Sequence, residues 1–375
     1  MQRKHQIAIV CAVLTVTLGV STACTQNTTT SPATPTITQT PTKTTVVTTA
    51  AAITTAAPVT STTTEPTTSA VPTTSAQTTT SVPPTTTTAA YMPPVTFAVG
   101  TTPQGIAFDG TNIWVVNMGS LPIGTVTKLK ASTGSLVGEY KVGLSPTGIC
   151  FDNTNIWVAN LGDGTVTKLK ASDGSLVGTY PVGAQPTGIV FDGTNVWVAC
   201  LGSATVVELK ASDGSLVGTF NAGKSPSSIL YDGTNIWITN RSTAGTVTKL
   251  KADGSLVGAY NVGTRPAGLA YDGTNIWVAN GGSNNVTALK ASDGTVMGSY
   301  SVGSNPTGIG FSDGAIWVSN TNSNTMTRLK ASDGSVLGTY PMGNGPGGVC
   351  FEGSNIWVTS SANSYVIRMP KANMQ

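Results

Sequence analysis

Histidine is almost missing from this sequence: among 375 residues the single one is His5. The rest of the chain therefore has no imidazole for a catalytic triad, a proton shuttle or a zinc site. Aspartate and glutamate remain as possible acids and bases, so the composition does not exclude an enzyme. It leads us to predict no catalytic residue, no metal site and no cofactor.

Charge is scarce too: Asp, Glu, Lys and Arg make up 9% of the sequence, and the formal net charge is +3. Arg3 and Lys4 belong to a segment that is typical of an export signal, so the remainder of the chain is close to neutral. A nucleic-acid-binding domain carries a concentrated basic patch, which is not found here. We therefore expect no nucleic acid among the partners.

The five cysteines include no CxxC pair and no metal-ligand spacing. Cys150 and Cys350 occupy equivalent positions in two copies of a repeat, described below, where other copies carry small or apolar residues. Cys200 stands where most copies have asparagine. We predict that these three are buried free thiols.

Residues 1–23 are predicted to be a signal peptide, because Arg3 and Lys4 precede an uncharged apolar run over residues 7–20 that is short for a membrane span. Residues 20–24, VSTAC, resemble the lipobox of bacterial lipoproteins, which implies acylation of Cys24. Ser21 departs from the usual leucine of that motif, and ordinary cleavage before Cys24 fits as well. We expect an exported lipoprotein anchored in the membrane at the cell surface, with plain secretion as the alternative.

Residues 24–94 are rich in Thr, Pro, Ser and Ala, and only Lys43 and Glu65 among them are charged. Such a segment lacks the aromatic and branched apolar side chains that a core requires, so we predict a disordered linker. Its threonines would permit O-glycosylation without establishing it.

Seven tryptophans set the period of the remaining sequence: Trp114, Trp157, Trp197, Trp237, Trp277, Trp317 and Trp357. The intervals are 40 residues, except for the first, which is 43. One copy, residues 142–181, holds four strand-like runs, which we call a (148–151), b (155–160), c (165–171) and d (176–180). Asp-Gly turns typical of hairpins separate a from b and c from d. Seven units of four antiparallel strands predict an all-β, seven-bladed β-propeller.

The two ends of the repeat array complete one another. The seventh unit stops after residues 365–368 without a strand d, whereas residues 95–100 match the end of a strand d, with Phe97 at the place of Tyr180. We predict that this N-terminal strand completes the last blade and closes the ring, which removes an exposed sheet edge. The propeller would span residues 95–371 as a monomer, followed by a tail over 372–375.

The motif at residues 186–200, PTGIVFDGTNVWVAC, and its copies resemble the NHL- and YVTN-type repeats of bacterial propeller proteins, many of which are exported. The resemblance covers all seven units and implies blades, not an activity. Two enzyme families share such blades, the streptogramin (virginiamycin B) lyases and the gluconolactonase-like hydrolases. The lyases rely on catalytic histidines that have no counterpart here, and the metal site of the hydrolases cannot be placed on this sequence.

Polar residues recur at two positions of the unit. Glu352 begins the a–b turn of the last copy, and aspartates begin it in five others: Asp109, Asp152, Asp192, Asp232 and Asp272. Calcium binding is one interpretation, and a carboxylate that accepts hydrogen bonds from its own turn is the simpler one. The tryptophans are expected to pack between blades rather than to stack on a ligand. Asparagines that end strand b are expected to bridge neighbouring loops, with sugar binding as the alternative.

The two faces of the predicted ring differ in how much their turns vary. The a–b and c–d turns share one face and repeat almost unchanged, whereas the d–a and b–c loops on the other face differ between blades. Variable loops on a rigid scaffold commonly carry recognition, although unconstrained drift would look the same. Lys224, Arg241 and Arg265 fall on adjacent loops of blades four and five, beside Asn240. They could form a cationic patch for carboxylates or phosphates, or be three solvated side chains.

We therefore expect a cell-surface or periplasmic binding module that recognises an unknown protein or an acidic glycan through the d–a/b–c face. Two alternatives remain open: a metal-dependent lyase or hydrolase of the propeller type, and a structural component of the cell envelope.

Overall fold

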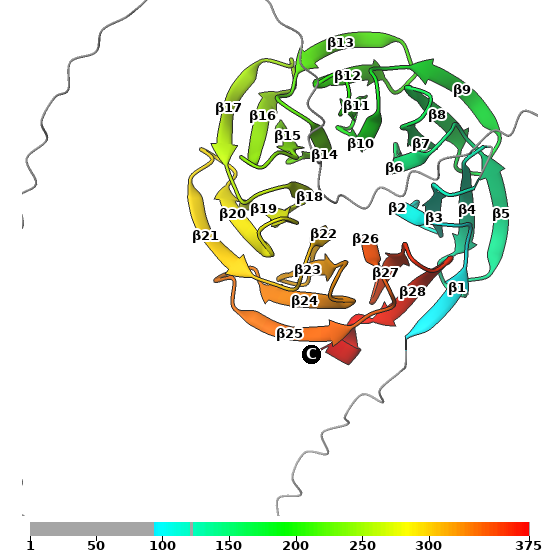
Figure 1. Ribbon diagram of the computed structural model, residues 1–375. Helices are drawn as coiled ribbons and strands as arrows, with labels where there is room; N and C mark the ends of the chain where they lie inside the picture. Colours follow the sequence, from blue (N-terminus) through cyan, green and yellow to red (C-terminus); the bar gives the residue numbers. More distant parts are fainter. Residues whose placement is uncertain (1–93, 121–122, 375) are drawn as a thin grey trace, which may run out of the picture. The chain divides into compact units, whose positions relative to one another are not determined.

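The computed structural model describes residues 94–120 and 123–374; the predicted signal peptide, Cys24 and all but the last residue of the linker lie outside them. Seven four-stranded antiparallel sheets follow one another around a ring (Figure 1). The seven-bladed propeller predicted from the repeat is confirmed. Strands a to d of each blade run from the centre of the ring to its rim.

Blade one consists of β2 (Pro103–Phe108), β3 (Asn112–Asn117), β4 (Thr125–Lys130) and β5 (Leu136–Lys141). Blade two consists of β6 (Pro146–Phe151), β7 (Asn155–Asn160), β8 (Thr165–Lys170) and β9 (Leu176–Pro181). Blade three consists of β10 (Pro186–Phe191), β11 (Asn195–Cys200), β12 (Thr205–Lys210) and β13 (Leu216–Asn221). Blade four consists of β14 (Pro226–Tyr231), β15 (Asn235–Asn240), β16 (Thr246–Lys251) and β17 (Leu256–Asn261).

Blade five consists of β18 (Pro266–Tyr271), β19 (Asn275–Asn280), β20 (Asn285–Lys290) and β21 (Val296–Ser301). Blade six consists of β22 (Pro306–Ser312), β23 (Ala315–Asn320), β24 (Thr325–Lys330) and β25 (Val336–Pro341). Blade seven consists of β26 (Pro346–Glu352), β27 (Asn355–Ser360), β28 (Tyr365–Pro370) and the N-terminal strand β1 (Val95–Ala98).

The N-terminal strand closes the ring as predicted. β1 pairs antiparallel with β28, with Phe97 opposite Val366. The Phe97 ring stacks on Trp357 with 5.3 Å between centroids, much as Tyr140 lies 5.5 Å from Trp114 in blade one. The two ends of the array therefore form one blade with the same aromatic contact as an uninterrupted blade.

The core lies between the blades. All seven tryptophans are fully buried or nearly so, and each contacts the following blade: Trp157, for example, clusters with Val196 and Val198. Trp357 packs in the same way against Ile113 and Val115 of blade one. A single blade would leave these indoles in water, so burial of the tryptophans requires neighbouring blades.

Cations on strand c also join neighbouring blades. Lys128 Nζ lies 4.9 Å from the centre of the Trp114 ring and donates to the carbonyl oxygens of Ala171 and Ser172 at 2.8 and 3.0 Å. Lys168 and Lys249 make equivalent contacts with the c–d turns of blades three and five. Each ammonium group is thus buried with hydrogen-bond acceptors and an aromatic face, which offsets its loss of water.

The predicted domain boundary at Lys371 falls at the start of a short 3₁₀-helix, η1 (Lys371–Met374). Met374 is fully buried, and its carbonyl oxygen accepts a hydrogen bond of 2.7 Å from the Arg328 guanidinium. Lys371 pairs with Asp313 at 2.6 Å. The helix supplies blade six with the carbonyl acceptor that a c–d turn supplies elsewhere. Within the residues described, no helix is long and apolar enough to cross a membrane.

Candidate functional site

The repeated aspartates are turn residues that also hold the tryptophans. Asp232 Oδ1 accepts hydrogen bonds from the backbone N–H groups of Thr234 and Asn235, at 2.8 and 2.7 Å. Its Oδ2 accepts a hydrogen bond of 2.7 Å from Trp237 Nε1. The same bonds recur in blades one, two, three and five. The turn interpretation therefore fits better than calcium binding, because both carboxylate oxygens are already bonded within the blade.

In blade one these bonds also shift the acidity of the carboxyl group. Burial of Asp109 opposes its ionisation, but hydrogen bonds from Trp114, Asn112 and Thr111 outweigh burial and hold the pKa of Asp109 below its ordinary value. The group is therefore an ionised acceptor at neutral pH and is unsuited to donate a proton.

Blades six and seven lack this arrangement. In blade six Ser312 replaces the aspartate, and Trp317 Nε1 reaches only the Ser312 carbonyl oxygen, at 3.4 Å. In blade seven Glu352 accepts a hydrogen bond of 2.9 Å from Asn355 Nδ2 instead. Trp357 Nε1 is left buried without a hydrogen-bond partner in the described part of the chain. The last blade thus carries a local defect on the a–b/c–d face.

Cys150, Cys200 and Cys350 are free thiols, as predicted, but only Cys200 is fully buried; the predicted burial is wrong for Cys150 and Cys350, which are partly exposed. Burial raises the pKa of Cys200 to about 11 and that of Cys350 to about 12. All three are therefore protonated and poor nucleophiles at neutral pH. Across residues 94–120 and 123–374, no group of three or more His, Cys, Asp or Glu side chains could hold a metal ion.

Asn240 lies beneath the surface where the cationic patch was predicted. It is 2% exposed, and its Nδ2 donates to Thr246 Oγ1 and Thr248 Oγ1 at 3.1 and 2.8 Å. In blade two the equivalent Asn160 also accepts a hydrogen bond from the backbone N–H of Gly143 in the d–a loop. The predicted bridge between loops is therefore found for Asn160, whereas Asn240 Oδ1 is buried without a hydrogen-bond partner among the described residues. Asn240 bonds to strand c of its own blade and does not line the face itself.

The three cationic loops are in direct contact. The backbone N–H of Arg241 donates to the Ser225 carbonyl oxygen at 2.9 Å, which joins the b–c loop to the loop that carries Lys224. The backbone N–H of Arg265 donates to the Ser242 carbonyl oxygen at 2.8 Å, which joins the same b–c loop to the d–a loop of blade five. The side chains of Arg241 and Arg265 are thereby presented next to one another.

The two guanidinium groups have no carboxylate to neutralise them. Arg241 is half-buried, its Nε is enclosed without a hydrogen-bond partner, and burial followed by the nearby charge of Arg265 lowers the pKa of Arg241. The ion pairs found among the described residues involve neither arginine. Asp163, the acid on this face, bonds instead to the backbone N–H of Leu144 in blade two. Lys224 is exposed and makes no ion pair or hydrogen bond through its ammonium within the described residues.

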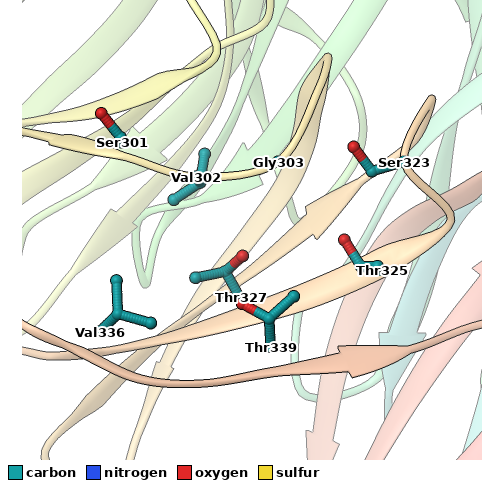
Figure 2. A pocket seen from close by; sticks show the side chains of 8 residues that line it. All are labelled: Ser301, Val302, Gly303, Ser323, Thr325, Thr327, Val336 and Thr339. Carbon is teal, nitrogen blue, oxygen red and sulfur yellow. The ribbon is translucent and has the colours of Figure 1, made fainter.

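A hydroxyl-rich groove of about 400 Å³ lies elsewhere, between blades five and six (Figure 2). Its lining residues are Ser301, Val302, Gly303, Ser323, Thr325, Thr327, Val336 and Thr339. The hydroxyls of Thr325 and Thr327 accept hydrogen bonds from Asn320 Nδ2, at 3.1 and 2.9 Å. The groove contains no charged side chain, so it differs in chemistry from the arginine pair.

No model of a known protein family matches the sequence, and no curated protein matches it. Solved structures do match. A hydrazine synthase structure from Kuenenia stuttgartiensis is 18% identical, with a TM-score of 0.65 over 77% of this chain and 99% of that one. The virginiamycin B lyase of Staphylococcus aureus is 15% identical, with a TM-score of 0.64 over 74% of this chain and 99% of that one. A streptogramin B lyase structure is 18% identical, with a TM-score of 0.63 over 73% and 96%. At these identities the likeness shows the fold alone, a β-propeller.

Proposed function

We propose that this propeller is a binding module that holds an acidic glycan on its d–a/b–c face, at Arg241 and Arg265. The observation that supports the proposal is the pair of neighbouring arginines that form no ion pair with any carboxylate of the described residues. Two like charges that are partly removed from water repel one another, and a bound anion relieves that repulsion.

The geometry suits an oxyanion. A guanidinium group presents its N–H donors in a planar fork that matches a carboxylate, a sulfate or a phosphate. Next to Arg265, the hydroxyls of Thr264 and Ser283 lie 3.0 Å apart on the exposed surface. Hydroxyl groups beside a cation fit a sugar that carries both hydroxyls and an acidic group.

The binding test compares two double variants. Arg241→Ala with Arg265→Ala removes two positive charges from the patch, whereas Lys170→Ala with Lys210→Ala removes two exposed charges from strands that end at the opposite face. The probes are polygalacturonate, which carries carboxylates, and dextran, which is neutral. Charged hydrogen bonds contribute about 1.5–3 kcal/mol each, so we expect the arginine variant to bind polygalacturonate at least about tenfold more weakly.

The lysine variant should bind polygalacturonate as the parent does, and neither protein should bind dextran. Equal loss in both double variants would mean that only net charge matters. A parent that binds neither polysaccharide, or that binds only an acidic protein, would overturn the glycan assignment.

We further propose that the protein is an exported NHL/YVTN-type lipoprotein, held at the cell surface by acylated Cys24 and the Thr-rich segment. The sequence of residues 1–94 supports this placement. Cys24→Ala should move the protein out of the detergent phase or leave it unprocessed. Unchanged detergent partitioning of the variant would contradict lipid anchoring.

A lyase is the second candidate, because two of the matching structures are titled as streptogramin B and virginiamycin B lyases. Such a lyase would have to work without a catalytic histidine, because the only histidine of the sequence, His5, lies in the predicted signal peptide. Incubation of the purified protein with a streptogramin B separates the two functions: ring opening detected by mass spectrometry favours the lyase.

A further inference from the structure

The outer strands begin with exposed pairs of large apolar residues. These are the first two residues of β5, β9, β13, β17, β21 and β25: Leu-Val in four blades, Val-Met in β21 and Val-Leu in β25. Their exposed fractions lie between 43 and 66%. We call these twelve residues the apolar rim. Scattered exposed leucines are common, but an exposed apolar pair at the same place in six blades is a repeated feature that fits an interaction surface.

A β-bulge gives the rim its form. In all six blades the pairing of strands c and d shifts by one residue at this point; Leu129 pairs with Leu136 while Gly138 already pairs with Lys128. Val137 is the extra residue. Two consecutive side chains therefore stay exposed where a regular strand would turn one of them inward.

Other exposed positions on the same strands have not remained apolar. The fourth residue of strand d is Glu, Thr, Thr, Ala, Ser and Thr across the six blades, and the sixth is Lys, Pro, Asn, Asn, Ser and Pro. All twelve rim residues, by contrast, are Leu, Val or Met. Duplication alone does not explain this difference, because neighbouring exposed positions of the same repeats diverged.

The geometry of the ring indicates a flat partner. The outer strands follow one another around the ring, and each rim pair directly follows a c–d turn, so the six pairs lie toward the same face of the ring (Figure 1). The chain outside the propeller joins it at the same end: β1 begins at Val95 opposite Arg368, and the guanidinium of Arg368 bonds to the Ala131 and Ser132 carbonyl oxygens of a c–d turn. The described chain, which begins at residue 94, therefore enters the propeller on the face where the rim lies.

We propose that the apolar rim docks on a lipid bilayer, with the Leu, Val and Met side chains entering the boundary between headgroups and acyl chains. The proposal extends the lipid anchoring proposed above. The lipid anchor would hold the propeller near the bilayer, and a second, weak contact through the rim would then add to the attachment.

The charges at the rim indicate that the binding is apolar rather than electrostatic. Strand c ends in an exposed lysine in each of the six blades, and five of the adjoining turns carry an exposed aspartate. Lys290 pairs with Asp293 at 3.6 Å and Lys330 with Asp333 at 2.9 Å. The balanced charge predicts similar binding to neutral and anionic lipid, with little effect of salt.

The test uses the chain from residue 25 onward, which lacks Cys24, and co-sedimentation with phosphatidylcholine vesicles. We expect the parent to bind. A variant with Leu136→Ser, Leu176→Ser, Leu216→Ser and Leu256→Ser should bind at least tenfold more weakly. Vesicles of equal parts phosphatidylcholine and phosphatidylglycerol should give the same ratio of parent binding to variant binding.

The matched control carries Thr179→Ser, Thr219→Ser and Thr339→Ser, at exposed fourth positions of the same strands, and should bind as the parent does. A near-ultraviolet circular dichroism spectrum checks that the buried tryptophans are still packed. If the fourfold variant unfolds, the single Leu176→Ser and Leu216→Ser variants should each lower binding.

Absence of vesicle binding by the parent, or equal binding by the fourfold variant, would overturn the proposal. Loss of a dimer in the fourfold variant without any vesicle binding would assign the rim to a second copy of the chain instead. Because this protein lacks Cys24 and keeps Arg241 and Arg265, the result is independent of acylation and of glycan binding.

Discussion

The two faces of the ring are held together in different ways. On the a–b/c–d face, side chains make the bonds: Asp232 holds Trp237, and Lys249 reaches the carbonyl oxygens of the next blade. On the d–a/b–c face, the bond that recurs in every blade is made by backbone groups, and the side chains that add bonds there differ between loops, such as Asp163 in one and Ser203 in another. In all seven blades the residue after strand b donates its N–H to the carbonyl oxygen of the residue before the strand-a proline, as Arg241 does to Ser225.

This difference explains why one face repeats and the other varies. A side chain that makes a bond must be retained for the blade to form, whereas a backbone bond leaves the choice of side chain open. Arg241 corresponds to Leu161 and Leu201 in other blades, and Arg265 corresponds to Ser145 and Gln185. The fold tolerates different residues at these positions, so selection for ligand binding can decide which residue occurs there. The comparison predicts that substitutions lower stability on the first face and alter binding on the second.

Opening the ring should have the largest effect, because both faces depend on a closed set of blades. A chain that begins at residue 100 lacks β1, exposes the edge of β28 and removes the contact between Phe97 and Trp357. We expect aggregation, or a melting temperature lower by about 10 °C or more, which corresponds to several kcal/mol. Differential scanning calorimetry with light scattering measures both. A monomeric truncated protein that melts with the parent would show that closure is unimportant.

Asp232→Asn should have a smaller but clear effect on stability. The amide keeps one acceptor for the turn, but its NH₂ group would face the Trp237 Nε1–H and leave that donor unbonded. A lost bond between a buried donor and a charged acceptor corresponds to about 1.5–3 kcal/mol. Urea unfolding followed by tryptophan fluorescence measures the change.

Arg241→Ala is the matched substitution on the other face. Its backbone bond to Ser225 is unaffected, and surface substitutions of this kind usually change stability by less than about 0.5 kcal/mol. If Arg241→Ala destabilises the protein as much as Asp232→Asn, the contrast between the two faces is wrong.

The sequence predicts the features that are local to one repeat. The strand-like runs, the Asp-Gly turns and the period predict the blades. The incomplete seventh unit, together with residues 95–100, predicts the closure of the ring. The order of blades also places Lys224, Arg241 and Arg265 on adjoining loops. The bond between Asp232 and Trp237 was missed, although the spacing of five residues between these types recurs in five copies.

Contacts between blades could not be predicted in the same way. Lys128 bonds to Ala171, 43 residues away, yet a lysine in a strand ordinarily indicates a solvated position. The burial of Asn240 depends on where Thr246 and Thr248 point after folding. The exposure of Leu136 and Val137 depends on a bulge that the apolar pattern of strand d does not reveal. The first of these features is set by packing between blades, and the other two by how consecutive strands of one blade pair and orient their side chains.

Glu352→Asp should have a modest effect of the opposite sign, a stabilisation, because it restores in blade seven what five other blades possess. Trp357 Nε1 is buried without a partner in the described structure, and the longer side chain of Glu352 turns to Asn355 instead. Aspartate would place a carboxylate where Asp232 meets Trp237. The turn must adjust, since Gly353 has a φ of 49° where Gly193 has 101°, but glycine permits both conformations.

This rearrangement offsets part of the gain. We therefore expect Glu352→Asp to raise the free energy of unfolding by about 1 kcal/mol and the melting temperature by about 2–4 °C. The reciprocal Asp232→Glu should destabilise by a similar amount, because the added methylene carries the carboxylate past Trp237. Thermal unfolding of Glu352→Asp, Asp232→Glu and the parent measures both changes in melting temperature. Equal melting temperatures for all three proteins would show that the bond between carboxylate and indole adds nothing, and that the aspartates repeat only for the sake of their turns.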